Sequence, residues 1–88
     1  MSTTITLRKP LEIAGEVVSE LTLREPLGGD IRRCGIPFTV KAGDVVIDSE
    51  AIAKYISVLA VVPPSTVDKL SAPDFLDCQN AVMLFFSE

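Results

Sequence analysis

The sequence predicts an α+β fold in which an N-terminal antiparallel β-hairpin or small sheet packs against two or three C-terminal helices. Two observations carry this prediction. The first part of the chain alternates apolar and polar residues with a period of two, which is typical of half-buried strands. After residue 47, apolar residues recur at helical spacing behind helix-capping residues. With 88 residues, we expect a single domain, 1–88, with a modest core.

Residues 4–24 form the predicted hairpin. Its apolar residues stand at odd positions: Ile5, Leu7, Leu11, Ile13, Val17, Leu21 and Leu23. Ala14-Gly15 interrupts the alternation, and glycine readily adopts the positive φ of a tight hairpin turn. We therefore expect strands at about 4–13 and 16–24. Pro10 has no N–H to donate, which predicts an edge position or a bulge at that point.

A connector at residues 26–47 is expected to hold only short elements. Pro26 should end the second strand, and Asp30 is a candidate N-cap for a short helical turn. From Ile36 to Ile47 the chain is rich in β-branched residues on either side of Ala42-Gly43-Asp44. This pattern favours a second, smaller hairpin or an extended arm.

The first main helix is expected at about 48–62, with Asp48 as its N-cap. Its apolar residues recur at helical spacing and should face the sheet: Ile52, Tyr55, Ile56, Leu59 and Val62. Pro63-Pro64 should end this helix, because a proline ring disfavours the α conformation of the residue before it.

Two further helical segments are predicted. Ser65 is the expected cap of a short turn at about 65–70. Ser71 should cap a helix at about 71–86, with Asp74 at the third position completing a capping box.

Composition excludes several classes of function. The chain has 8 Lys and Arg against 12 Asp and Glu and carries a net charge of −4, so it lacks the basic footprint of a nucleic-acid-binding protein. Its longest apolar runs, Val58–Val62 and Ala81–Phe86, are far shorter than the roughly 18 residues of a spanning helix. We therefore expect no nucleic acid and no membrane among its partners.

No catalytic, cofactor-binding or metal-binding site is predicted, and we interpret the chain as a non-enzyme without cofactors. It contains no histidine, which removes the commonest general base and metal ligand. No pair of carboxylates converges by spacing, and nothing near Ser65 or Ser71 could activate a nucleophile. Cys34 and Cys78 are interpreted as small, half-buried apolar residues in a reducing cytosol.

The C-terminal stretch "AVMLFFSE" is the main candidate for a functional surface. On a helical wheel, Phe75, Gln79, Val82 and Phe86 share one side, which we expect to face the core. Leu84 then falls roughly opposite. The last turn is apolar all round, and so small a domain cannot cover it completely. We therefore expect Met83, Leu84 and Phe85 to bind a partner; the alternative is that Leu84 is a single exposed leucine without a function.

The order of the sequence features resembles a known family. A hairpin ending in "LTLREP" is followed by the connector "GGDIRRCGIPF", an acidic-capped helix and "VVPPSTVDKLSAPDFLDCQNAV". In this order, from about Ile5 to Phe86, the chain resembles the tail assembly chaperones of long-tailed bacteriophages, often described simply as phage tail assembly proteins.

The resemblance implies a protein that acts in the cytoplasm of the bacterial host during virion morphogenesis. Such a chaperone binds the hydrophobic tape-measure protein, assists assembly of the tail tube and is absent from the mature virion. The implied partners are the tape-measure protein and the tail-tube protein, and self-association into a homo-oligomer stays open. The alternatives are a small structural tail or neck protein of the phage particle and a generic protein-binding adaptor.

Overall fold

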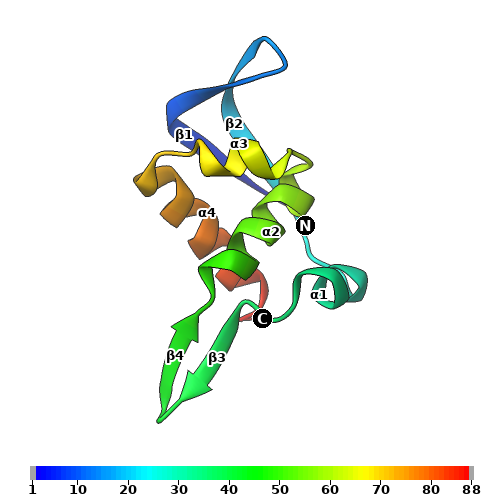
Figure 1. Ribbon diagram of the computed structural model, residues 1–88, viewed down its shortest axis with the longest axis vertical. Helices are drawn as coiled ribbons and strands as arrows, with labels where there is room; N and C mark the ends of the chain where they lie inside the picture. The colour runs from blue at the N-terminus through cyan, green and yellow to red at the C-terminus, as the bar shows by residue number, and fades with distance from the viewer. Residues whose placement is uncertain (1, 88) are drawn as a thin grey trace.

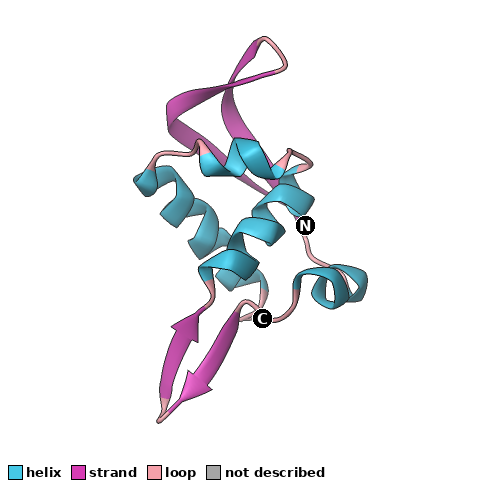
Figure 2. Ribbon diagram, viewed as in Figure 1, coloured by secondary structure: helices cyan, strands magenta, loops and turns pink. Residues whose placement is uncertain are grey.

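The computed structural model describes residues 2–87. Within this range the chain forms two β-hairpins and four helices (Figure 1). The elements in chain order are β1 (Ser2–Ile13), β2 (Glu16–Arg24), α1 (Gly28–Cys34), β3 (Phe38–Lys41), β4 (Asp44–Ile47), α2 (Ser49–Ala60), α3 (Pro64–Asp68) and α4 (Ala72–Phe85). The β1–β2 hairpin lies at one end of the molecule, the helices lie in the middle and the β3–β4 hairpin projects from the opposite end (Figure 2). The predicted α+β class is confirmed.

The N-terminal hairpin has the predicted turn and the predicted bulge. Ala14 and Gly15 both have positive φ, 52° and 82°, as a two-residue turn of type I′ requires. The pairing register shifts between Thr6 and Leu11, which brackets the proline that cannot donate to the ladder.

One consequence of this shift was not predicted. Beyond the bulge, Leu11 lies opposite Val18, so Leu11 is buried and Val18 is partly buried against the core. Val17, which we expected to face the core, is instead 74% exposed. The simple alternation therefore fails only on the turn side of the bulge.

The hydrophobic core lies between this hairpin and the helices. Its buried members come mostly from β1, β2, α2 and α4: Leu7, Leu11, Leu21, Leu23, Ile52, Tyr55, Ile56, Leu59, Cys78, Ala81 and Val82, joined by Cys34 and Val67. The predicted inward face of α2 is confirmed, with Val62 only partly buried beyond its end. Both cysteines are free and buried.

The start of α2 follows the prediction and its end does not. The Asp48 side chain accepts hydrogen bonds from the backbone N–H groups of Glu50 at 3.0 Å and Ala51 at 3.2 Å. The helix ends at Ala60, before the proline pair, because Val61 adopts the left-handed conformation with φ 56° and ψ 53°. The turn is closed by a bond from the Val62 N–H to the Ser57 carbonyl at 3.0 Å.

Two predicted caps are wrong. Asp30 lies at the third position of α1, and its side chain accepts a hydrogen bond from the backbone N–H of Leu27, the residue before the helix, at 2.8 Å. Pro63, with no side-chain capping bond, occupies the cap position of α3, which then begins at Pro64. Ser65 therefore lies inside the helix, and Pro64 at the first helical position has no N–H that would need a cap.

The N-cap of α4 is confirmed at Ser71, whose hydroxyl accepts from the Asp74 N–H at 3.4 Å. The expected core face is confirmed at Val82, but the helix is rotated so that Phe75, Gln79 and Phe86 are only partly buried. The side chains that are buried on α4 are Asp74, Cys78, Ala81 and Val82. The capping box is also incomplete, because the Asp74 carboxylate is bonded to β1 rather than to the cap residue.

The second hairpin, β3–β4, confirms the prediction of a smaller hairpin or arm. Its strands pair with each other and with no other described strand. Apart from Phe38, which is partly buried, every residue of both strands is exposed. The hairpin therefore projects as an arm beyond the helical layer (Figure 1).

Candidate functional site

The last turn of α4 combines one exposed and several half-buried apolar side chains. Leu84 is 67% exposed, which makes it the most exposed large apolar side chain within any described helix. Met83 and Phe85 are partly exposed, but both also pack against the core. The three residues expected to bind a partner are thus unequal, and Leu84 is the most exposed of them.

A groove of about 260 Å³ lies beside this turn. Ala81, Leu84 and Phe85 of α4 line it together with Thr3 and Glu25. The groove therefore lies where the first residues of β1, the end of β2 and the end of α4 come together. An apolar side chain from another molecule would meet apolar atoms of α4 and polar groups next to them.

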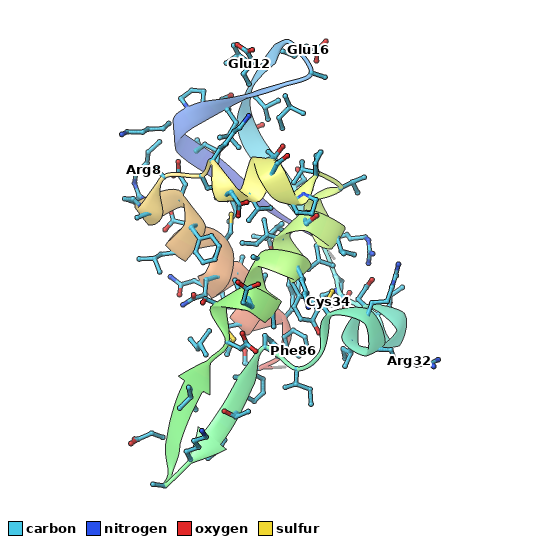
Figure 3. All side chains as sticks on the ribbon, viewed as in Figure 1. Arg8, Glu12, Glu16, Arg32, Cys34 and Phe86 are labelled. Atoms are coloured by element: carbon cyan, nitrogen blue, oxygen red, sulfur yellow. The ribbon has the colours of Figure 1, made fainter. Side chains whose placement is uncertain are left out.

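Phe86 fixes the position of this turn. Its ring lies edge to face against Tyr55 of α2, with ring centroids 5.5 Å apart, and against Phe38 of β3 at 6.3 Å. Such pairs stabilise by about 0.5–1.5 kcal/mol beyond their burial. The Tyr55 hydroxyl in turn donates to the Gly35 carbonyl. The C-terminal turn thus packs Phe86 against the core (Figure 3), whereas Leu84 stays exposed.

The other end of α4 is attached to β1 by Asp74. Its carboxylate accepts hydrogen bonds from the backbone N–H groups of Arg8 at 2.9 Å and Lys9 at 3.1 Å, the groups that the bulge leaves without strand partners. The Arg8 side chain lies over the first turns of α4 (Figure 3) and pairs with Asp77 at 2.9 Å. These hydrogen bonds hold the pKa of Asp74 below its ordinary value, and the bond from the Arg8 N–H has the largest effect.

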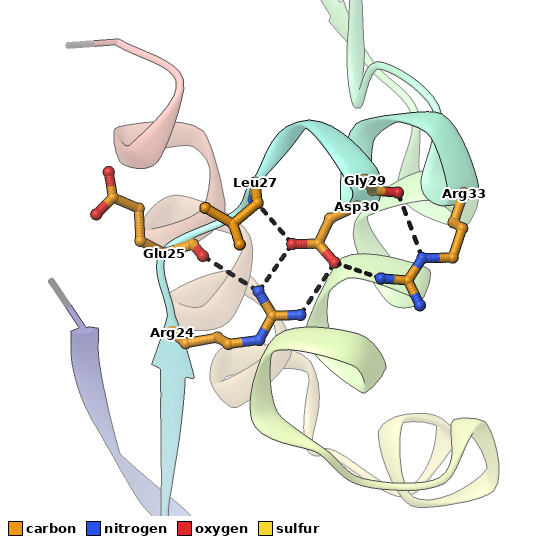
Figure 4. A network of polar contacts seen from close by, with 6 residues as sticks. All are labelled: Arg24, Glu25, Leu27, Gly29, Asp30 and Arg33. Carbon is orange, nitrogen blue, oxygen red and sulfur yellow. Dashed lines mark hydrogen bonds and ion pairs between the residues drawn. The ribbon is translucent and has the colours of Figure 1, made fainter.

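A second buried carboxylate, Asp30, joins the end of β2 to α1 (Figure 4). Arg24 donates to both its oxygens, at 2.8 and 3.0 Å, and Arg33 donates to one of them at 3.1 Å. The Arg24 hydrogen bond, followed by the one from the Leu27 N–H, holds the pKa of Asp30 far below its ordinary range. Asp30 thus connects the sequence pieces "LTLREP" and "GGDIRRC", on which the resemblance partly rests.

Sequence reasoning missed both carboxylates as connectors. For Asp30, the spacing of Arg33 three residues later was an available signal, because residues three apart share a helix face. For Asp74 no local signal exists, since its partners lie 65 and 66 residues away.

The described residues show neither a metal-ligand cluster nor a thiol with a lowered pKa. Within residues 2–87 no three His, Cys, Asp or Glu side chains lie together as a metal site would require. Burial raises the pKa of the Cys78 thiol to about 11, and burial also raises that of Cys34. Both sulfurs are therefore held as thiols, which are poor nucleophiles. Across the same residues, no helix is long and apolar enough to cross a membrane.

Comparison with known proteins gives one family. Residues 4–87 match the family described as "Phage tail assembly chaperone proteins, E, or 41 or 14". No match was found among curated proteins or among solved structures. The family match covers nearly the whole chain, including both hairpins and all four helices. The chain therefore belongs to the phage tail assembly chaperones.

Proposed function

We propose that the protein binds the hydrophobic tape-measure protein in the cytoplasm of the bacterial host, keeps it soluble while the tail tube assembles, and does not remain in the mature virion. In this role it binds other tail proteins without catalysing a reaction. The family supports the general role, and the exposed turn at the end of α4 supports a binding surface formed by Met83, Leu84 and Phe85.

The single observation that carries the proposal is the 67% exposure of Leu84. Leu84 stands beside a groove and on a turn whose backbone is fixed by Phe86. A fixed turn loses little conformational entropy when it binds, so its apolar surface is available for the client. Met83 adds an unbranched, adaptable side chain that suits irregular apolar clients.

Co-expression of the chain with tape-measure protein tests this surface. Leu84→Asp should leave folding almost unchanged, since substitutions of exposed residues usually alter stability by about 0.5 kcal/mol or less. It should nevertheless lower the amount of soluble tape-measure protein strongly, because an unpaired carboxylate in an apolar interface is costly. Soluble client would be measured by co-purification.

Two variants serve as controls. Val17→Asp makes a comparable apolar-to-acidic change at an exposed position, 74% accessible, in the turn region of the β1–β2 hairpin, and it should retain the client. Val82→Asp places the same charge at a fully buried position of α4 and should unfold the domain. If Leu84→Asp keeps the client soluble as well as Val17→Asp does, the last turn of α4 is not the binding surface.

A further inference from the structure

The β3–β4 arm has one wholly apolar face and one mixed face. Its cross-strand pairs are Phe38 with Ile47, Thr39 with Val46, Val40 with Val45, and Lys41 with Asp44. Because side chains alternate between the faces of a ribbon, the first and third pairs share one face and are all apolar. Val40 and Val45 are 64% and 59% exposed on that face. A two-stranded ribbon of this kind is marginally stable alone in water.

The directions of the backbone groups follow from one hydrogen bond at the base of the arm. The Asp48 N–H donates to the Pro37 carbonyl at 2.8 Å, so this pair belongs to the hydrogen-bonded set. In an antiparallel ladder such pairs alternate with pairs that are not bonded to each other. Phe38 and Val40 therefore direct their N–H and C=O groups away from β4, toward the free edge of β3. Val45 and Ile47 do the same at the free edge of β4.

We propose that the free edge of β3 pairs with β3 of a second copy of this chain, in antiparallel orientation about a two-fold axis at Thr39. In this register Phe38 lies opposite Val40 of the second copy and Val40 lies opposite its Phe38. The outward N–H and C=O groups of these two residues are then all used. The two ribbons become one four-stranded sheet, and their apolar faces lie on the same side of it.

Charge selects the β3 edge over the β4 edge. In the β3 pairing, Lys41 lies opposite Pro37 of the second copy, so no like charges meet. The equivalent pairing of β4, with Val45 opposite Ile47, would place Asp44 opposite Asp48 of the second copy, and like charges directly opposite each other destabilise a sheet. The arm carries one cation and one anion, Lys41 and Asp44. The two arms are therefore each neutral, and their pairing adds no repulsion to that between two copies of charge −4.

A matched pair of proline variants tests this edge. Val40→Pro and Val45→Pro each remove an outward N–H and a valine of similar exposure, and each leaves the hydrogen bonds between β3 and β4 in place. Sedimentation equilibrium of the full chain from micromolar to millimolar concentration should show a dimer for the wild type. Val40→Pro should raise the dimer dissociation constant by about tenfold or more, because each dimer loses two hydrogen bonds, whereas Val45→Pro should change it by less than about threefold.

Far-UV circular dichroism shows whether both variants fold, and amide hydrogen exchange of the wild type gives a second measurement without any substitution. Protection of the Phe38 and Val40 amides should rise with protein concentration, while the Val45 and Ile47 amides should continue to exchange rapidly. A wild type that stays monomeric throughout, equal weakening by both prolines, or concentration-dependent protection on β4 instead of β3 would overturn the proposal. These measurements do not depend on client binding by the end of α4. Self-association through β3 and client binding through α4 can therefore be refuted independently.

Discussion

At the scale of single residues, the stability of this small domain depends on two buried carboxylates that join distant or irregular segments. Asp74 satisfies the backbone N–H groups that the bulge in β1 leaves without partners. Asp30 gathers Arg24, Arg33 and the Leu27 N–H where β2 leads into α1. A buried N–H without an acceptor destabilises the folded state. Each carboxylate removes this cost by accepting the hydrogen bonds of backbone N–H groups that have no other partner.

Asp74→Asn should destabilise the protein. An amide side chain keeps one acceptor oxygen but directs an NH₂ group at the second backbone N–H, which leaves two donors facing each other. We expect the Tm to fall by roughly 5–10 °C. Asp77→Asn is the matched control, since Asp77 pairs with the same arginine but is 38% exposed. Equal melting temperatures for the two variants would mean that the bond to β1 contributes little.

The same carboxylates predict acid sensitivity. Their pKa values are lowered in the folded protein, so below about pH 4 the unfolded chain binds protons that the folded chain does not. Their contribution to the unfolding free energy is complete above that pH and is lost as the pH falls further. Thermal melts between about pH 7 and pH 2 should show a falling Tm in the acid range. A Tm that is constant down to the lowest pH would contradict this assignment.

At the scale of elements, the end of α2 contains local strain. Val61 has φ 56°, a left-handed conformation that a β-branched residue rarely adopts. Its side chain is 82% exposed, so little packing compensates for this conformation. The residue is nonetheless needed there, because its turn directs the chain from α2 into the proline pair and α3.

Val61→Gly should therefore stabilise the protein. A left-handed conformation costs an ordinary residue about 1–2 kcal/mol, whereas glycine loses about 0.5–1 kcal/mol of backbone entropy on ordering. We expect the free energy of unfolding to rise by about 0.5–1 kcal/mol in urea titrations. Ala60→Gly, one residue earlier and still helical, should have the opposite effect. A loss of stability in both variants would show that Val61 is not strained.

Local patterns predict most elements but not how they meet. Alternation, the Ala14-Gly15 turn and Pro10 suffice for the first hairpin, and Asp48 and Ser71 mark two helix starts, because caps and turns depend on neighbouring residues. Apart from Val82, the core face of α4 could not be predicted in this way. The prediction took Phe75 and Phe86 as core residues. The buried side of α4 instead begins with Asp74, whose carboxylate accepts its hydrogen bonds from β1, a strand distant in the sequence.

The candidate surface was predictable only in part for the same reason. The exposure of Leu84 follows from its place on the helix, opposite the core. The partial burial of Phe85 does not, because it depends on the true rotation of α4. The anchoring of Phe86 depends on Tyr55 and Phe38, which come from two other elements.

At the scale of the whole molecule, the two proposed surfaces lie on different parts of the chain. The arm offers a backbone edge for a second copy, and the end of α4 offers apolar side chains for a client. Both begin near Phe86, whose ring contacts the base of the arm and α2. A chaperone with a separate client site could bind an apolar protein without using the edge that we propose for self-association.

The central claim is that the protein acts during tail assembly and does not remain in the tail. Quantitative mass spectrometry of purified particles, alongside the lysate in which they assembled, tests it most directly. We predict abundant chain in the lysate and none in finished particles that contain tape-measure protein and tail-tube protein. Recovery of the chain from purified particles at a fixed ratio to the tail-tube protein would contradict the claim and identify a structural tail or neck component instead.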